Sequence, residues 1–555
     1  MTRQHSIVWL VIGVHAVLLT ALLSACSPSE SNVAIGNRTG VLHYGIGSEV
    51  QTLDPHVLSD TGAWEISGAL FEGLIRLNPE TLEPEPGVAE SWEISDDGLT
   101  LIFKLNPEAK WSNGDPVTAG DFVWSWQRSL HPAMGNIMAE YLYPIKNAEP
   151  YAKGLIDDPA QLGIQALDKY TLKLQLENPT PYIFQLLATP GAYPVHRATI
   201  EAYGDATARY TRWTRVDNMV NNGPFNLTDW KMYRHLRVER SDTYWDAANV
   251  SLNAIMFRPI DSDTAEEKMF RAGQLHITFR MPVNKILAYA ALDDSPYVQA
   301  PLLGSYYYLF NIQKPLVNDV RVRRALSMAI DRELLVGKVL MGTELPSASI
   351  VPLGIAEYTP QHHVDFDPVQ ARQLLAEAGF VNGEGWPGLE LVYNTNEGHR
   401  RIAVAVQQMW KEHLNIEVTL TNQEWKVYLD TVDNKQFAMA RMGWIGVYLD
   451  PGTFLNRFTT HGATNRTGFT DARFDEIIEE LAPAATSLRE RYTLMREAEN
   501  LFMRQHAIIP IYSYTGKHLV QPSVRGYYPN IMEYRDFKHI SLDASVGEWR
   551  WKSAD

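Results

Sequence analysis

Alternating apolar and polar residues predict β-strands at several points of the chain. Leucine or phenylalanine occupies every second position of the segment 99–105. The segments 171–176 and 416–421 alternate in the same way, with the apolar positions Leu172, Leu174, Leu176, Ile416, Val418 and Leu420. A period of two places one set of side chains in a core and the other outside it. Each segment is therefore predicted to form a half-buried strand.

Apolar residues spaced by about one helical turn predict helices elsewhere. One predicted helix carries its apolar face at Val322, Leu326, Ile330 and Leu334. Asn318 and Asp319 are its candidate N-caps. A second helix is expected to begin at Asp367, with Pro368 in its first turn, and to end at Gly379. Its buried face would be Leu374, Leu375 and Ala378. Strands that alternate with helices are typical of an α/β protein.

The N-terminus has the features of a bacterial export signal. Arg3 precedes an apolar run over 7–23, which is marginal in length for a membrane span. The run ends in Leu-Ser-Ala-Cys, which resembles the lipobox of bacterial lipoproteins. The resemblance implies a signal peptide at 1–25, cleavage before Cys26 and a lipid on Cys26. The alternative is an ordinary signal peptide with an incidental cysteine. Residues 26–40 are rich in Ser, Asn, Pro and Gly, and are predicted to form a flexible tether.

The composition indicates a globular protein of more than one domain and argues against some functions. A chain of 555 residues is too long for one hydrophobic core, so two or three domains are expected. The apolar fraction of 45% and charged fraction of 21% are those of a globular protein. A net charge of −16 argues against a general nucleic-acid binder, because such binding needs Lys and Arg against phosphate. With Cys26 as its one cysteine, the chain has no internal disulfide and no multi-cysteine zinc site.

Enzyme motifs are weak. The sequence contains no GxSxG, HExxH or GxxxxGK[ST] motif. Residues 383–388 fit GxGxxG, but a predicted helix precedes them and Pro387 stands where backbone donors would be needed, so a turn is predicted. His362 and His363 are interpreted as a surface pair. We therefore expect no enzymatic activity, no cofactor and no bound metal.

Several motifs together resemble the dipeptide- and oligopeptide-binding proteins of bacterial ABC importers, the family 5 extracellular solute-binding proteins. They occur in the family's order and extend from about residue 41 to 525. They are TLDPH at 52–56, LFEGL at 70–74, PGVAESW at 86–92, KWSNGDPVTAGDF at 110–122, YYY at 306–308, LLAEAG at 374–379 and RMGW at 441–444. One such motif alone would be weak, but the ordered set is specific.

The resemblance implies a two-lobed α/β trap of the periplasmic-binding-protein type, with an additional third domain. Lobe I would comprise 41–71, 197–300 and 515–555; the third domain, 72–196; and lobe II, 301–514. Chain crossings near residues 300 and 514 would form the hinge. The implied role is to capture a peptide or other small solute as a monomer at the extracytoplasmic face. An ABC permease and ATPase complex would receive the solute, because nothing in the chain indicates ATP hydrolysis.

The resemblance also implies a ligand site. Arg441 would contact the ligand carboxylate, since a guanidinium offers a fork of donors. His399 would meet the C-terminal ends of longer ligands. The backbone-pairing positions would be Gly443, Ile445 and Thr61, and the pocket-lining aromatic residues would be Trp425, Trp444 and Tyr307.

Position 447 departs from the family pattern. Peptide-binding relatives have an aspartate after Gly-Trp that pairs with the ligand's α-ammonium, whereas this chain has Val447. Loss of one side of such a buried pair costs roughly 2–5 kcal/mol. The ligand is therefore expected to have an N-terminus that is blocked, absent or held elsewhere, with Asp450 and Glu424 as candidate replacements. Two alternatives remain: a receptor for a non-peptide solute such as an oligosaccharide, and a lipoprotein sensor or chaperone.

Overall fold

The computed structural model describes residues 30–58, 60–462 and 464–551. The predicted signal peptide and Cys26 lie outside these residues. The described chain is a mixed α/β protein in which three larger sheets each carry their own hydrophobic core. Among the described helices, none combines the length and the apolar character that a membrane crossing needs.

The first large sheet has the strand order β1-β10-β9-β8, and we call this part of the molecule lobe I. Its strands are β1 (Val41–Gly45), β8 (Phe225–Lys231), β9 (His235–Arg240) and β10 (Ala254–Arg258). Strand β1 pairs parallel to β10, and the other pairs are antiparallel. The surrounding helices are α2 (Asn32–Thr39), α3 (Thr61–Leu70), α7 (Arg197–Ala202), α8 (Asp263–Arg271) and α9 (Ile286–Ala290).

Helix α2 corrects part of the tether prediction. Ser31 caps its first turn by accepting a hydrogen bond from the Ala34 amide, and Gly40 ends it in the left-handed conformation. The side chain of Val33 is fully buried. Composition alone suggested a flexible segment, but these caps and this buried contact fix residues 32–39 as a helix.

The second large sheet belongs to the third domain and is antiparallel, in the order β4-β5-β7-β6. Its strands are β4 (Ala89–Ile94), β5 (Thr100–Leu105), β6 (Ile164–Asp168) and β7 (Thr171–Gln175), and the accompanying helices are α4 (Ala119–Leu130), α5 (Ala148–Ala152) and α6 (Ile183–Leu187). A capping box between Thr118 and Asp121 begins α4, and Phe122 and Trp126 bury its apolar face against the sheet. Strands β2 (Ile75–Leu77) and β3 (Pro84–Pro86) form a separate hairpin.

The third large sheet has the order β12-β16-β11-β15-β13-β14, and we call this part lobe II. Its strands are β11 (Tyr297–Phe310), β12 (Leu345–Pro346), β13 (Leu389–Asn394), β14 (Val418–Gln423), β15 (Met439–Ile445) and β16 (Ile508–Leu519). Its helices are α10 (Val320–Met328), α11 (Arg332–Leu334), α12 (Pro368–Glu377), α13 (Glu397–Leu414), α14 (Trp425–Asp433), α15 (Gly452–Leu455), α16 (Ala472–Glu476) and α17 (Leu488–Arg504). Two hydrophobic clusters contain buried residues of this lobe.

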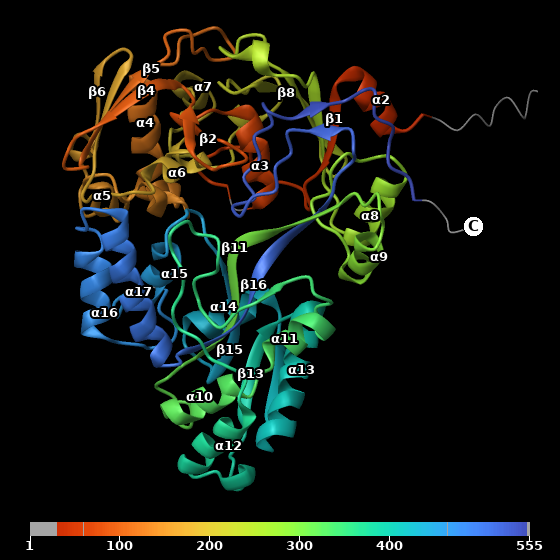
Figure 1. The fold of residues 1–555 in the computed structure, drawn as a ribbon. Helices are drawn as coiled ribbons and strands as arrows, with labels where there is room; N and C mark the ends of the chain where they lie inside the picture. The colour runs from red at the N-terminus through yellow and green to blue at the C-terminus, as the bar shows by residue number, and fades with distance from the viewer. Residues whose placement is uncertain (1–29, 59, 463, 552–555) are drawn as a thin grey trace, which may run out of the picture.

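Two long antiparallel strands, β11 and β16, connect the lobes (Figure 1). Their pairing runs from Tyr297 with Leu519 to Leu309 with Ile508 and contains two register shifts. Beyond β16, Val520 bridges Ile277 of lobe I. The short pair β17 (Val524–Arg525) and β18 (Ser541–Leu542) completes the C-terminal segment. The predicted hinge crossings fall on these two strands, and the exact domain boundaries remain a prediction.

Beyond α2, local structure differs from the predicted apolar patterns at one further helix. Strands β5, β7 and β14 occur where alternation predicted them, and α12 has Asp367 as its N-cap. The single helix predicted through Leu334 is wrong. It stops after Met328, and a new helix starts because the Asp331 side chain accepts a hydrogen bond from the Leu334 amide. Leu334 consequently lies exposed rather than on a buried face.

Candidate ligand-binding site

A cavity of about 730 Å³ lies between the lobes and the third domain. Lobe I contributes α3 and residues 279–283, and the third domain contributes residues near 137–141 and 185–189. Lobe II contributes residues 445–447 and 514–518, and a C-terminal segment, 532–535, closes one side. This volume is within the range of pockets for small ligands.

Three of the predicted site residues lie on the cavity wall: Thr61, Ile445 and Val447. Thr61 is the first residue of α3, whereas Ile445 and Val447 are at the end of β15 and just beyond it. The fold thus brings residues from both lobes to one cavity, although they are almost 400 positions apart in the sequence. Their contacts with ligand backbone or side chains remain a prediction.

Strand β15 has an open edge beside this cavity. It pairs with β11 from Met439 to Ile445, but with β13 only at Met439 and Ala440. From Gly443 to Ile445 the described chain therefore adds no strand on the β13 side. A Cβ on Gly443 would come 2.5 Å from the Tyr514 hydroxyl, so a larger residue here would have to displace that side chain.

Arg441 is a cation without a carboxylate partner in the described residues. Its Nη2 donates to the Tyr514 hydroxyl at 2.7 Å, and its Nη1 lies 3.4 Å from Asn394 Oδ1. The guanidinium sits 4.6 Å from the centre of the Tyr306 ring, and Nε is buried without an acceptor. Because Tyr514 lines the cavity, Arg441 is placed directly behind its lobe II wall.

His399 is a neighbour of Arg441 in the first turn of α13, where its amide donates to the Asn396 cap. Burial and the adjacent Arg441 lower the pKa of His399 to about 3. The ring lies 5.6 Å from that of Tyr306. His399 is therefore neutral at physiological pH and does not add a second positive charge beside Arg441.

The three predicted pocket aromatics do not line the cavity. Trp425 is half exposed and stacks on Tyr428 at the start of α14. The Arg457 guanidinium lies over the Trp444 ring, 3.6 Å from the ring centre. The Nε1 of Trp444 is buried without an acceptor. The placement of Tyr307 on a pocket wall is wrong for this structure, because this side chain is 2% exposed and belongs to the lobe II core.

The two acids suggested as replacements for the missing aspartate are engaged elsewhere. Asp450 is buried in a two-bond ion pair with Arg491, with both distances 2.8 Å. Glu424 caps α14 by accepting from the amides of Lys426 and Val427. Neither carboxylate lines the cavity beside Val447. The missing charge is therefore not restored by the nearest acids in the sequence.

A contact between the third domain and lobe II borders the cavity, and sequence reasoning missed it. The rings of Tyr182 and Tyr448 stack with their centres 4.2 Å apart. The Leu449 amide donates to Gln185 Oε1 at 2.7 Å. Gln185 and Val447 both line the cavity, so this contact connects its opposite walls. No local signal could have revealed it, because the partners are more than 260 positions apart.

Removal of the Tyr182–Tyr448 stack should weaken ligand binding without unfolding the protein. An aromatic pair contributes about 0.5–1.5 kcal/mol beyond area burial, so Tyr448→Ala should raise the Kd by about 2- to 12-fold. Small-angle scattering should show a larger radius of gyration at a given ligand concentration. Tyr233→Ala is the control, because Tyr233 is 76% exposed on lobe I. An unchanged Kd and radius in Tyr448→Ala would contradict this role.

Comparison with known proteins assigns the chain to a family. Residues 83–466 match the model of the bacterial extracellular solute-binding proteins, family 5, middle region. The chain belongs to this family of solute-binding proteins. The family resemblance seen in the sequence is thereby confirmed, as is the α/β fold of this type.

Relatives of this family 5 protein match over nearly their whole lengths. The periplasmic oligopeptide-binding protein OppA of Salmonella typhimurium is 36% identical over 525 residues, which is 92% of this chain and 94% of the relative. The solved structure of the Escherichia coli murein tripeptide binding protein MppA superposes with a TM-score of 0.77 at 35% identity, covering 90% and 98% of the two chains. The probable deoxycholate-binding periplasmic protein YgiS of Escherichia coli is 33% identical over 534 residues, covering 94% and 96%.

Proposed function

We propose that this protein captures oligopeptides outside the cytoplasm and delivers them to an ABC import permease and its ATPase. The observation that carries the proposal is the open edge of β15 at Gly443–Ile445, beside a cavity between the lobes. An extended peptide can add to such an edge through backbone hydrogen bonds, which are independent of its sequence. Arg441 supplies a cation for the ligand carboxylate from behind the same wall.

We also propose that peptides with a modified N-terminus are ligands. Val447 presents an apolar side chain to the cavity where peptide-binding relatives have an aspartate. A free α-ammonium placed against Val447 would lose its water without gaining a carboxylate, which is unfavourable. An acylated or otherwise uncharged N-terminus has no such cost. Cell-wall-derived peptides are one class that fits.

The N-terminal sequence and the relatives support the proposed site of action. Relatives named periplasmic match almost the full chain, which supports a periplasmic or equivalent extracytoplasmic location. The Leu-Ser-Ala-Cys sequence at 23–26 supports a lipid anchor on Cys26. Capture needs one cavity in one chain, so we propose a monomer.

A second candidate function is the binding of a non-peptide solute. It is favoured by Val447 on the cavity wall and by the match to a relative named as a probable deoxycholate-binding protein. The open β15 edge favours peptides, because a steroid or a sugar lacks a backbone that could pair with a strand. Arg441 does not distinguish a peptide from a bile acid, because both carry a carboxylate. A sensor or chaperone role would use the same cavity but no permease.

Native mass spectrometry of the tag-cleaved protein tests the proposed function. Peptide receptors retain ligand when a cavity closes around it, so we expect a co-purified population with peptide masses and peptide fragment spectra. A single co-purified compound that fragments as a sugar or a steroid would contradict the oligopeptide proposal and support the second candidate function. The protein after denaturation and refolding serves as the ligand-free control.

A further inference from the structure

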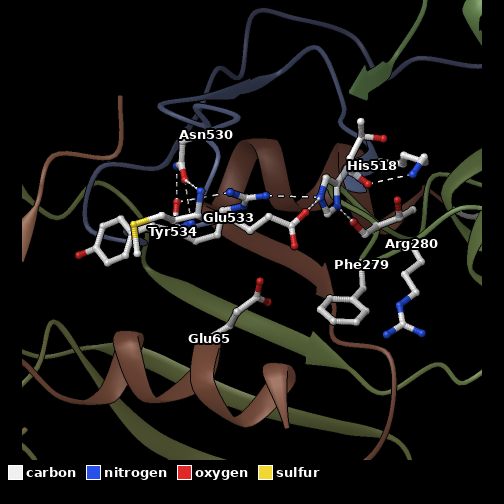
Figure 2. A network of polar contacts seen from close by, with 12 residues as sticks. Glu65, Phe279, Arg280, His518, Asn530, Glu533 and Tyr534 are labelled. Carbon is white, nitrogen blue, oxygen red and sulfur yellow. Dashed lines mark hydrogen bonds and ion pairs between the residues drawn. The ribbon is translucent and has the colours of Figure 1, made fainter. Parts of the chain in front are cut away.

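One end of the cavity carries two carboxylates that the family resemblance did not indicate. Glu65 comes from α3 of lobe I, and Glu533 comes from the C-terminal segment. Figure 2 shows the Glu65 carboxylate directed toward the side of the cavity where Glu533 and His518 lie. These residues are 468 positions apart, so only the fold brings them to the same cavity.

Glu65 has an unused acceptor. Its Oε1 accepts a hydrogen bond from the Tyr44 hydroxyl at 3.1 Å, while its Oε2 is buried without a partner. Burial, helped by the charges of Glu533 and Glu266 and opposed by Arg535 and the Tyr44 hydrogen bond, raises the pKa of Glu65 to about 8. Glu65 is therefore mostly protonated at pH 7, and a ligand cation that donates to Oε2 would stabilise its ionised form.

Glu533 is ionised and held in place. Burial would raise its pKa, but the hydrogen bond and charge of His518, followed by Arg535 and Lys517, lower the pKa to about 2. His518 Nε2 lies 2.9 Å from Oε1, and Oε2 has no hydrogen-bond partner in the described chain. Gly516 leaves the room for this arrangement, because a Cβ there would overlap Glu533 Oε1.

The neighbouring cations are already engaged or directed elsewhere. Arg535 donates to the Tyr527 hydroxyl at 2.9 Å, and Lys517 pairs with Glu344 at 2.7 Å. The Arg280 guanidinium lies over the Phe279 ring, and in Figure 2 it points away from Glu65. Arg535 also acts on both carboxylates, lowering the pKa of Glu65 and of Glu533, and its Nε is buried without an acceptor. Glu65 Oε2 and Glu533 Oε2 nevertheless have no hydrogen-bond donor among the described residues, so this end of the cavity offers a ligand two acceptors.

We propose that the space between Glu65 and Glu533 binds a positively charged side chain of the ligand, either an ammonium or a guanidinium group. The inference rests on the proposed function and adds a preference for basic peptides. A cation there would donate to the free Glu65 Oε2 and face the ionised Glu533. With the ligand carboxylate at Arg441, opposite charges of one ligand would contact lobe II and lobe I, which favours closure around it.

The test uses N-acetylated tripeptides of alanine, in which lysine or the uncharged norleucine replaces the residue at each position in turn. We expect one lysine position to bind the native protein at least tenfold more tightly than its norleucine counterpart. Glu65→Gln and Glu533→Gln should each remove most of this advantage and leave norleucine binding unchanged. Asp263→Asn is the matched control, because Asp263 is another carboxylate of the same cavity wall.

The pH dependence gives an independent readout. A cation requires ionised Glu65, whose pKa in the free protein is about 8, so binding of the lysine peptide should release a proton below pH 8. Its affinity should rise by up to about tenfold per pH unit below pH 8 and level off above. Glu65→Gln should abolish the rise, and the norleucine peptide should lack it.

The outcomes separate this inference from the proposed function. Equal binding of lysine and norleucine peptides at all three positions overturns the inference while oligopeptide binding stands. A lysine advantage that persists in both glutamine variants also overturns it. Failure of every tripeptide to bind removes the proposed function itself.

Discussion

Replacement of Arg441 by glutamine should weaken binding of a peptide with a free C-terminal carboxylate by about thirtyfold or more. Arg441 lies behind the cavity wall without an ion-pair partner in the described residues. A ligand carboxylate would therefore be the first anionic partner of its guanidinium. Truncation of one side of a buried charge pair costs about 2–5 kcal/mol, and 1.4 kcal/mol corresponds to tenfold. Calorimetric titration of native and variant proteins with one tripeptide measures this difference.

Two controls accompany the Arg441→Gln titration: a peptide without a C-terminal carboxylate, and a substitution at a different arginine. A C-terminally amidated tripeptide should bind weakly to the native protein and should lose nothing further in Arg441→Gln. Arg466→Gln should have little effect, because Arg466 already pairs with Asp433 at the surface. Arg441→Lys should recover part of the affinity, since it keeps the charge without the fork. If Arg441→Gln weakens binding of the tripeptide with a free C-terminus and of the amidated tripeptide by the same factor, Arg441 does not contact the ligand carboxylate.

Replacement of Val447 by aspartate should strengthen binding of peptides with a free N-terminus by about thirtyfold or more. The new carboxylate would face the cavity beside the open edge of β15, where an α-ammonium can pair with it. Calorimetry with a tripeptide and its N-acetylated twin measures the change.

Two controls make the Val447 result specific. The N-acetylated twin should bind more weakly to Val447→Asp than to the native protein, because the carboxylate would be buried unpaired. Val447→Asn introduces a side chain of nearly the same shape as aspartate but without its charge, and it should not increase the affinity for either peptide. A Val447→Asp variant that binds the free peptide no better than the native protein would refute the account of this position.

Much of the fold could be predicted because its signals are local. The alternation along β5 and β7 and the cap of α12 at Asp367 are properties of a few consecutive residues. The patterns mislead where a capping residue overrides the local apolar period or composition. Asp331 starts a new helix inside an apolar pattern with the right period, and Ser31 and Gly40 bound a helix within a segment of tether-like composition.

The sequence predicted residues of the cavity wall at two places, Thr61 of lobe I and the segment that ends at Val447 of lobe II. The motif at 441–444 lies within β15, and the chain reaches the cavity directly after it, at residues 445–447. Tyr307 was placed on the pocket wall by the family resemblance alone, whereas in this structure Tyr306 and Tyr307 face opposite sides of β11 and each packs in a hydrophobic cluster of lobe II. Glu65 and Glu533 carry no signal in the sequence that relates one to the other.

The most direct test of the account is a calorimetric titration of the native, ligand-free protein with a tripeptide and its N-acetylated twin at pH 7. The account predicts that the N-acetylated peptide binds at least as tightly as the free peptide, because Val447 provides no charge for an α-ammonium that has lost its water. A free peptide that binds more than about thirtyfold more tightly than its acetylated twin would contradict this, since it would require an ammonium anchor elsewhere in the cavity.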